Sequence, residues 1–439
     1  MMRFNRRFGA VLTAVVLMVV AGCGGGDDED GGGGSSGQAK TSSNKPVTIN
    51  WWHIANNDPL KTIWKQAADE YHAAHPNVTI KITVLENEAF KAKLTTNMQA
   101  GKPPDVFQSW GGGTLKEQAD AGLVKDITQD AKPWVGTLNE AGVKLYQVDG
   151  KQYGIPYNLG VVGFWYNKKH FRKAGIDAPP TTWDEFLSDV QKLKSAGVTP
   201  LAVGEKDKWP GMFWWANLSL RIAGSEAMAK AGEDGSFDGP GFVEAGKQLK
   251  RLIDMKPFQP GFLAAPWDGA GGEAATMGNG RAAMDLMGQW APFTFNANTK
   301  DKKGLGDDLG WFAFPTVEGG KSQPTEYFGG GDGFAIGRDA PPEAVDFVKF
   351  LVSPPIGSRG GESGALLPTA KGTESSVKDP NMKSVLDARG QASFVQLYLD
   401  QAYAPAVGQA INDAVQQLFA GKASPEEVSK KIADAAKAG

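Results

Sequence analysis

The chain has 439 residues, of which 41% are hydrophobic and 22% charged, a composition that is ordinary for a soluble globular protein. This length exceeds what a single hydrophobic core supports, so we expect two domains. The net charge is −3, and it becomes −6 without residues 1–22, which hold three arginines and no acid. That balance argues against a nucleic-acid partner, because phosphate binding requires clustered cations.

The first 46 residues are expected to lie outside the fold. Residues 1–22 join an arginine-containing start to an apolar run that is too short for a permanent membrane span, which predicts a signal peptide. Val20-Ala21-Gly22-Cys23 is similar to the bacterial lipoprotein signal, in which the thiol is acylated; a free thiol beside an ordinary secretion signal is the alternative. Residues 23–46 then form the lipidated cysteine and a flexible tether rich in Gly, Ser and acids. Cys23 is the only cysteine, so no internal disulfide is possible.

Alternating strands and helices open the fold. Apolar patterning predicts strands over 47–52, 78–85 and 104–110, and helices over 59–75 and 90–100. The first helix begins at Pro59, with Asp58 as its N-cap. Repeated β–α–β units imply a parallel sheet covered by helices, with ligands at the carboxyl ends of its strands. The loops at those ends carry our first candidate site residues: Trp52, Asn56, Asn57, Asp58, Glu88 and Trp110.

The stretch Gly154–Asn167 has no formal charge and mixes β-branched and aromatic residues with glycines. It follows an Asp149-Gly150 turn signal that predicts a hairpin. We interpret it as a strand that leaves one domain, crosses a cleft and enters the second domain. An ordinary buried strand with a glycine bulge is the alternative. Tyr157 and Asn158 would then lie at the cleft.

The remaining elements continue the alternation. Thr182 and Glu185 form a predicted capping box, and Ser424 and Glu427 a second one near the C-terminus. A glycine cluster at 329–333 precedes the last predicted strand, and Pro354-Pro355 ends the helix that follows that strand. The other predicted helices are 182–194, 213–221, 241–255, 342–351, 385–389 and 405–419, and the other strands are 200–203, 281–287, 310–314 and 334–336.

Catalytic and metal-binding motifs are scarce. Four histidines without suitable spacing do not suggest a metal site, and no G-x-S-x-G elbow is present. A carboxylate pair for glycoside hydrolysis cannot be recognised from sequence, because its separation in space is what counts. We therefore expect no metal, no cofactor and no catalytic residue.

Tryptophans beside polar residues are the strongest remaining signal. Any one of them is better explained as core filling, but as a set they favour sugar binding, since sugar C–H faces lie on aromatic rings and hydroxyls suit amides and carboxylates. Beyond the residues already named, the candidates are Trp214, Trp215, Trp267, Asp268, Trp290, Asp332 and Tyr403.

The order of several short motifs resembles one family. These are the Asn57-Asp58-Pro59 loop, 103–106, 154–157, 165–168, 182–186 and 283–290. The chain is similar to the extracellular sugar-binding proteins of ABC importers, the maltose-binding-protein group, over nearly everything after residue 46. The details look closest to xylobiose and xylo-oligosaccharide binders. Maltose-type proteins carry an acid within the first crossing between lobes, which Gly160-Val161-Val162 lacks.

The resemblance implies an α/β, two-lobe (type II) binding-protein fold with a ligand cleft between its lobes. It places lobe 1 at 47–159 plus 315–366 and lobe 2 at 160–314 plus 367–439, with crossings near 159–162, 314–315 and 366–368. It implies a monomeric, lipid-anchored receptor outside the cytoplasmic membrane that passes an oligosaccharide to permease subunits with a cytoplasmic ATPase. The alternatives are a surface carbohydrate-active enzyme (glycosidase or lyase) and a sensor or adhesin.

Overall fold

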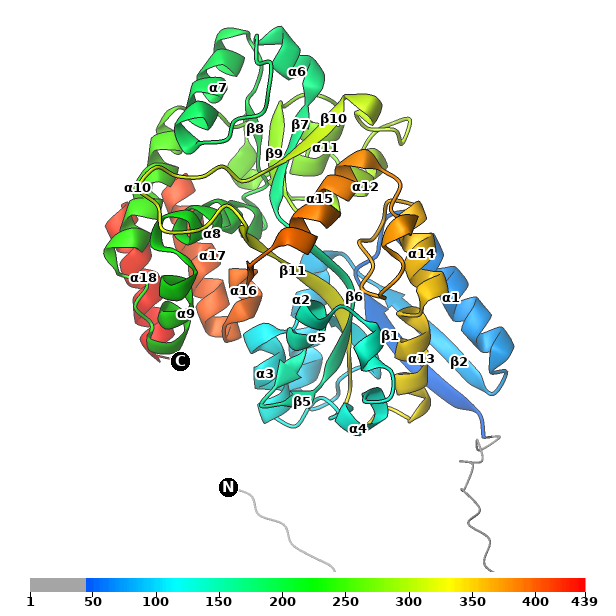
Figure 1. Cartoon of the computed structure of the whole chain (residues 1–439). Coiled ribbons are helices and arrows are strands. Elements are labelled where there is room, and N and C mark those ends of the chain that lie inside the picture. Colours follow the sequence, from blue (N-terminus) through cyan, green and yellow to red (C-terminus); the bar gives the residue numbers. More distant parts are fainter. Residues whose placement is uncertain (1–44, 439) are drawn as a thin grey trace, which may run out of the picture. The chain divides into compact units, whose positions relative to one another are not determined.

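The computed structural model describes residues 45–438, so the predicted signal peptide, Cys23 and most of the tether lie outside the described residues. Two main β-sheets organise this part of the chain, together with a two-stranded hairpin. Figure 1 shows them in different halves of the ribbon, each flanked by helices. The fold is α/β, as predicted.

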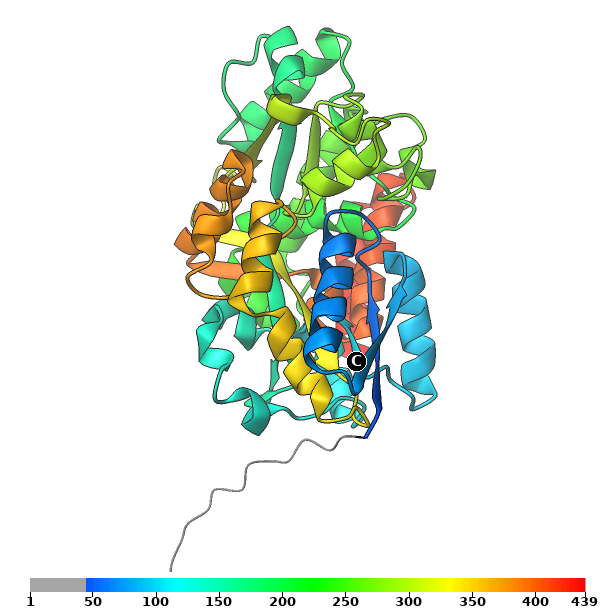
Figure 2. The same ribbon diagram turned by 90° about the vertical axis from the view of Figure 1, so that its right-hand side faces the viewer.

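The larger sheet contains the first strands of the chain. Strand β1 (Val47–His53) pairs in parallel with β2 (Val78–Val84) and β3 (Val106–Ser109), and the helices between them are α1 (Leu60–Ala74) and α2 (Asn87–Gln99). This is the predicted β–α–β arrangement. On the other side, β11 (Glu326–Ile336) runs antiparallel to β3 and to β6 (Gly154–Val161), and parallel to β12 (Phe394–Leu397). Helices α13 (Glu343–Leu351) and α14 (Pro354–Glu362) lie beside α1 (Figure 2).

The smaller sheet has the order β10 (Leu309–Ala313), β7 (Gly163–Asn167), β9 (Met284–Met287), β8 (Leu201–Ala202). Its surrounding helices include α7 (Trp183–Ser195), α8 (Trp209–Ala223) and α10 (Pro240–Asp254). Helices α17 (Pro405–Phe419) and α18 (Pro425–Ala438) pack on α8 and α10. Both predicted capping boxes, at Thr182 and at Ser424, are present.

Short elements complete the described chain. They are α3 (Gly112–Asp120), α4 (Thr128–Ala131), α5 (Glu140–Lys144), β4 (Gln147–Val148), β5 (Lys151–Gln152), α6 (Lys168–Lys173), α9 (Ser225–Asp234), α11 (Glu273–Gly278), α12 (Ala291–Ala297), α15 (Pro380–Gln391) and α16 (Leu399–Ala402), with 3₁₀ turns at 135–137, 262–264, 306–308 and 374–376. The β4–β5 pair is the predicted hairpin, and Asp149 and Gly150 both have positive φ at its turn.

The chain changes sheets at Val162. Strand β6 belongs to the larger sheet up to Val161, and β7 belongs to the smaller sheet from Gly163. Two other segments lie alongside this crossing: the middle of β11, and residues 367–368, where the Leu159 N–H donates to the Leu367 carbonyl at 3.2 Å. The lobe boundaries predicted from sequence stay a proposal; β12 follows the third crossing yet pairs with β11 of the larger sheet.

The glycine cluster at 329–333 belongs to the strand that was expected to begin only at residue 334. These residues are the middle of β11, an eleven-residue strand. Their neighbours explain the glycines: a Cβ on Gly331 would lie 2.6 Å from the Asn158 carbonyl, and one on Gly329 would lie 2.5 Å from the Gly160 carbonyl. Close approach of two backbones therefore requires glycine here, without any reversal of chain direction.

Two helix boundaries also differ from expectation. Pro354 and Pro355 do not only end α13; they form the first turn of α14, a position where proline costs no hydrogen bond. The Asp58 carboxylate accepts from the Thr62 N–H at 3.2 Å, four residues on, and Pro59 occupies the N-cap position. The helix therefore starts one residue later than predicted, at Leu60, and Asp58 is one residue too early to be the cap.

Buried aromatic and aliphatic residues fill both halves. One cluster joins the smaller sheet to α7, α8, α10, α17 and α18, and two smaller clusters lie on the faces of the larger sheet. Within residues 45–438, none of the helices has the length and apolarity that a membrane crossing requires. The two halves meet along the crossing segments, and a cavity lies beside these segments.

Candidate functional site

A cavity of about 140 Å³ lies between the two sheets. One wall comes from the larger sheet: the loop after β1, the start of α2, Trp110 after β3, and the crossing strands. The opposite wall comes from α8, the segment around Trp267, the start of α12, and α16. The cavity therefore lies at the carboxyl ends of the parallel strands, where such sheets bind ligands.

Aromatic rings form the wall on the smaller-sheet side. Trp290 is half-buried, and its ring centroid lies 6.4 Å from Trp209, 6.3 Å from Phe213 and 5.9 Å from Tyr398. Trp267 packs edge-on against Trp209 at 5.9 Å. Trp290 is thus supported from behind by rings that are themselves buried.

Two groups in this aromatic wall lack hydrogen-bond partners within residues 45–438. They are the indole N–H of Trp209 and the hydroxyl of Tyr398. Both residues line the cavity. A buried polar group without a partner carries a desolvation cost, so hydroxyl groups of a ligand would be favourable partners for both.

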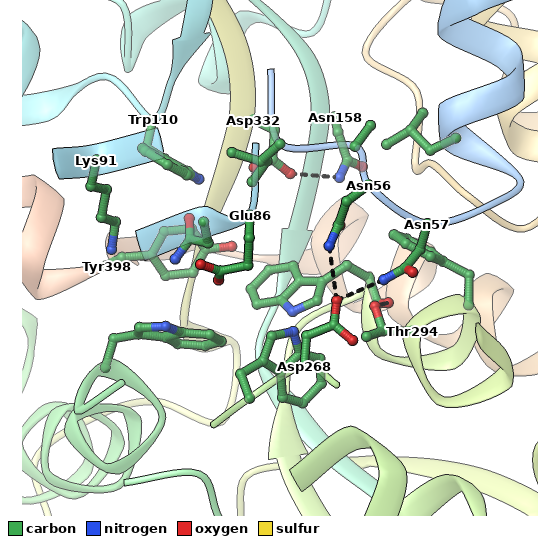
Figure 3. Close-up of a pocket in the computed structure, with 18 of the residues that line it drawn as sticks. Asn56, Asn57, Glu86, Lys91, Trp110, Asn158, Asp268, Thr294, Asp332 and Tyr398 are labelled. Atoms are coloured by element: carbon green, nitrogen blue, oxygen red, sulfur yellow. Dashed lines mark hydrogen bonds between the residues drawn. The ribbon is translucent and has the colours of Figure 1, made fainter. Parts of the chain in front are cut away.

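Polar side chains form the floor beneath the crossing strands. The Asp332 carboxylate accepts from Asn158 Nδ2 at 2.9 Å (Figure 3). It also accepts from Gln108 Nε2 at 3.1 Å. Burial raises the pKa of Asp332 to about 6, although these hydrogen bonds act in the opposite direction. Asn158 Oδ1 also accepts from the Leu367 N–H at 2.9 Å, so Asn158 joins all three crossing segments.

A side-chain bridge closes one end of the cavity. Asn56 and Asn57, after β1, donate to Asp268 Oδ2 at 3.1 and 2.8 Å (Figure 3). The second oxygen of Asp268 accepts from Asn298 Nδ2 at 2.6 Å and from the Gly269 N–H at 2.7 Å. We name these contacts the Asn–Asp bridge. Four donors saturate the Asp268 carboxylate.

Lys91 occupies the other end. Its ammonium lies 3.3 Å from Asp400, 3.5 Å from Glu88 and 5.5 Å from the Trp110 ring centroid. Burial alone would lower the pKa of Lys91, but Asp400 and Glu88 outweigh that effect and raise it. Asp400 and Glu88 therefore keep the Lys91 side chain charged and hold its ammonium in position. It is the only cation among the described residues that line the cavity, against the acids Glu86, Asp268, Asp332 and Asp400.

Most of the residues predicted from sequence come together here. Asn56, Asn57, Trp110, Tyr157, Asn158, Trp267, Asp268, Trp290 and Asp332 line the cavity. Glu88 and Asp58 line neighbouring grooves instead. Whether any of them contacts a ligand stays a prediction.

Four predicted residues lie elsewhere. Trp214 and Trp215 are buried in the core around α8, so assigning them to the binding surface was wrong. Trp52 points to the α2 side of β1, where Lys93 Nζ lies 4.4 Å from its ring centroid. Tyr403 packs against Phe237 with a centroid distance of 5.4 Å and does not line the cavity.

The sequence interpretation missed Trp209, Phe213, Tyr398, Glu86 and Lys91. A signal existed for the first two. Pro210 marks the start of α8, and Trp209 and Phe213 are four residues apart, so they share one helix face. For Tyr398 and Lys91, nothing local in the sequence indicates which surface they meet.

The most perturbed carboxyls lie away from the cavity. Burial raises the pKa of Glu205 and Glu273 well above the ordinary range, and that of Asp285 to about 7. All three are buried, Asp285 within strand β9 of the smaller sheet, and none of them lines the cavity. Within residues 45–438, no group of three or more His, Cys, Asp or Glu side chains is arranged to hold a metal ion.

Comparisons with known proteins identify the family to which this fold belongs. The family model of the bacterial extracellular solute-binding proteins matches residues 55–357. A structure solved in work on xylan utilization by the thermophilic bacterium Caldanaerobius polysaccharolyticus is 30% identical, with a TM-score of 0.81 over 88% of this chain and 99% of that one. A chitin oligosaccharide binding protein is 28% identical, with a TM-score of 0.80 over 90% and 100%.

Among curated relatives, an uncharacterized ABC transporter extracellular-binding protein of Pyrococcus horikoshii is 28% identical over 291 residues. The match covers 64% of this chain and 62% of that relative, so the chain spans about three fifths of its length. The family model covers more than half of the chain. With its two-domain α/β fold and its cavity between the two sheets, this chain belongs to the bacterial extracellular solute-binding protein family.

Proposed function

We propose that the protein captures a short neutral oligosaccharide, with xylobiose or a xylo-oligosaccharide as the first candidate, and presents it to an ABC permease. Its sugar-binding role in ABC transport follows from its family and its relatives. The observation that carries the choice of ligand is the cavity itself, in which a supported aromatic wall faces carboxylates and amides. Sugars have matching faces, since their C–H groups stack on rings and their hydroxyls pair with polar groups.

Charge and size narrow the ligand class. Four acids and one lysine line the cavity, so a uronic acid or a sugar phosphate would meet like charge. A volume of about 140 Å³ corresponds to roughly ten water molecules, or about one or two sugar rings. A pentose without a hydroxymethyl group suits such a space. The solved relative described under xylan utilization supports xylo-oligosaccharides, and the chitin oligosaccharide binder is the reason to include chitin fragments in the test.

A thermal-shift screen tests the proposal. Xylobiose, maltose, chitobiose and glucuronic acid are each added at millimolar concentration. A ligand that binds only the folded state adds about 2.7 kcal/mol to the free energy of unfolding at one hundred times its Kd, and the melting temperature rises as a result. We expect a clear increase with xylobiose and none with glucuronic acid. Absence of any increase with the neutral sugars would contradict the proposed function.

The protein is proposed to bind without catalysis. The acids of the cavity are engaged by amides or by Lys91. The three most perturbed carboxyls, Glu205, Glu273 and Asp285, do not line it. Prolonged incubation with xylotriose, followed by chromatography, should return the intact sugar. Release of xylose or xylobiose would favour the carbohydrate-active enzyme instead.

We also propose that Cys23 carries a lipid anchor and that the protein is a monomer. The lipid proposal depends on Val20-Ala21-Gly22-Cys23 and on the polar stretch that follows. Cys23→Ser should release the protein from membranes without changing its melting temperature, since stable attachment takes at least two acyl chains. Unchanged membrane association would refute the anchor, and a dimeric mass in light scattering would refute the monomer.

A further inference from the structure

The cavity adjoins a much larger groove. This groove has a volume of about 840 Å³ and lies between α2 and α3 on one side and residues 206–208, α16 and α17 on the other. Lys91, Trp110, Asp400 and Gln401 line both spaces. We name it the α2–α17 groove. The contact at the junction is the pair Lys91–Asp400, and a lysine side chain has many rotamers.

A different groove lies beyond the other end of the cavity. It has a volume of about 570 Å³ and shares Asn56, Asn57 and Phe293 with the cavity. Here the Asn–Asp bridge stands between the two spaces. Both asparagines donate to a carboxylate that Asn298 and a backbone N–H also hold in place. The two asparagines donate at 3.1 and 2.8 Å to an acceptor that two further donors hold, whereas Lys91 reaches Asp400 at 3.3 Å, so this end is closed more firmly than the Lys91 end.

The α2–α17 groove has the chemistry of a sugar-binding surface. Phe90, Leu94 and Met98 contribute a buried apolar floor from α2. Among the described residues, Gln118 Oε1 and Asn412 Oδ1 have no hydrogen-bond partner, and both side chains line the groove. Each is an acceptor that a small side-chain rotation would offer to a hydroxyl group.

We propose that the site binds one end of an oligosaccharide in the cavity, with the end unit against the Asn–Asp bridge and the following units in the α2–α17 groove. Lys91 marks the passage between the two. This inference depends on the proposed function and extends it, because it makes the ligand a chain of three or more units bound in one direction. The cavity alone would hold about one or two rings.

Two neighbouring threonines of α2 provide a matched test. Thr95 and Thr96 are both exposed, and each hydroxyl donates to the carbonyl four residues earlier, at 2.9 and 3.0 Å. Thr95 lines the α2–α17 groove and Thr96 does not. Thr95→Trp therefore fills the groove, and Thr96→Trp places the same ring outside it. Lys61→Trp fills the opposite groove, whose wall includes this exposed residue.

Calorimetric titration of xylobiose, xylotriose and xylotetraose into the wild type and into each variant measures how affinity changes with sugar length. For the wild type, we expect affinity to rise about tenfold from the disaccharide to the tetrasaccharide, as an added ring makes new contacts. Thr95→Trp should remove this gain and leave xylobiose binding within about twofold. Thr96→Trp and Lys61→Trp should keep the gain.

The outcomes separate this inference from the proposed function. If xylobiose binds but longer chains gain nothing in the wild type, the groove is not part of the site and the inference is refuted. If Lys61→Trp, and not Thr95→Trp, removes the rise in affinity with sugar length, the oligosaccharide extends into the opposite groove and the inference is also refuted. If none of the three sugars binds, the proposed ligand is wrong and the inference is lost with it. A melting curve for each variant without sugar checks that it is folded.

Discussion

Replacing Trp290 by alanine tests whether the aromatic wall binds ligand or only fills the core. The ring is half-buried and meets three other rings at 5.9 to 6.4 Å. Aromatic pairs at such distances contribute about 0.5–1.5 kcal/mol each. The ring is partly exposed to the cavity, so we expect the free energy of unfolding to fall by about 2 kcal/mol. A fully buried aromatic plug would cost about 3–5 kcal/mol.

The effect on ligand binding should be at least as large. A ring that stacks on a sugar behaves as a binding hot spot, so its loss should weaken binding by about 2 kcal/mol or more, which is about 30-fold in Kd. Trp311→Ala is the matched control, because Trp311 is also half-buried but lines none of the three spaces described above. It should lose stability and keep affinity.

Isothermal titration and unfolding curves without ligand measure the two effects separately. Trp290→Ala with intact affinity and a large loss of stability would show that the ring is a core plug and that the ligand binds elsewhere. Gly288→Ala tests the position of the Trp290 ring without removing it. A Cβ at that position would lie 2.1 Å from the Trp290 indole, so the ring must shift, and affinity should fall although Trp290 itself is retained.

Three further substitutions follow from the structure. Asn57→Ala removes a 2.8 Å hydrogen bond of the Asn–Asp bridge, which closes one end of the cavity, so binding should weaken about tenfold. Unchanged affinity in titration would show that the bridge does not assist binding. Burial raises the pKa of Asp285 to about 7, from an unfolded value near 3.9. The folded chain therefore holds this proton more tightly, and its contribution to stability is complete below about pH 4 and falls as pH rises to about 7. Asp285→Asn should flatten that decline in melting temperatures measured from pH 4 to 8, and an unaltered slope would count against the assignment. Gly331→Val should cost about 1–3 kcal/mol through overlap with the facing backbone, whereas Gly136→Ala, with open space around it, should be tolerated in the same denaturant titration.

Much of the fold could be predicted because local signals agreed with each other. The parallel strands β1, β2 and β3, both capping boxes and the Asp149-Gly150 turn depend on short-range patterns. Those patterns act within a few residues, so they need no knowledge of distant packing. The sheet change at Val162 was one of two interpretations of the uncharged aromatic run, because burial alone does not distinguish a crossing from an ordinary buried strand.

Tryptophans show where sequence reasoning stops. Composition indicated that some of them line a binding surface, yet Trp214 and Trp215 are core residues while Trp209, on the same helix, faces the cavity. On an α-helix, a residue five positions along points about 140° away from the first, so neighbours in sequence face different surroundings. Which face meets the cavity is set by how α8 docks on the sheet, and this is tertiary information. Tyr398 and Lys91 were missed for the same reason.

The glycine run at 329–333 was not predicted to be part of a strand, and its place in β11 explains the geometry of the site. Glycine permits both a reversal of chain direction and close contact between backbones, and sequence does not distinguish the two uses. In β11 the glycines bring the crossing strands within contact of each other, where no other side chain would fit. Asp332 is the one non-glycine residue in this run, and it lines the cavity while bonded to Asn158 and Gln108. In this strand the glycines allow close packing of the backbones, and Asp332 is the one residue that presents a carboxylate to the cavity. That carboxylate lies where the two halves of the protein join.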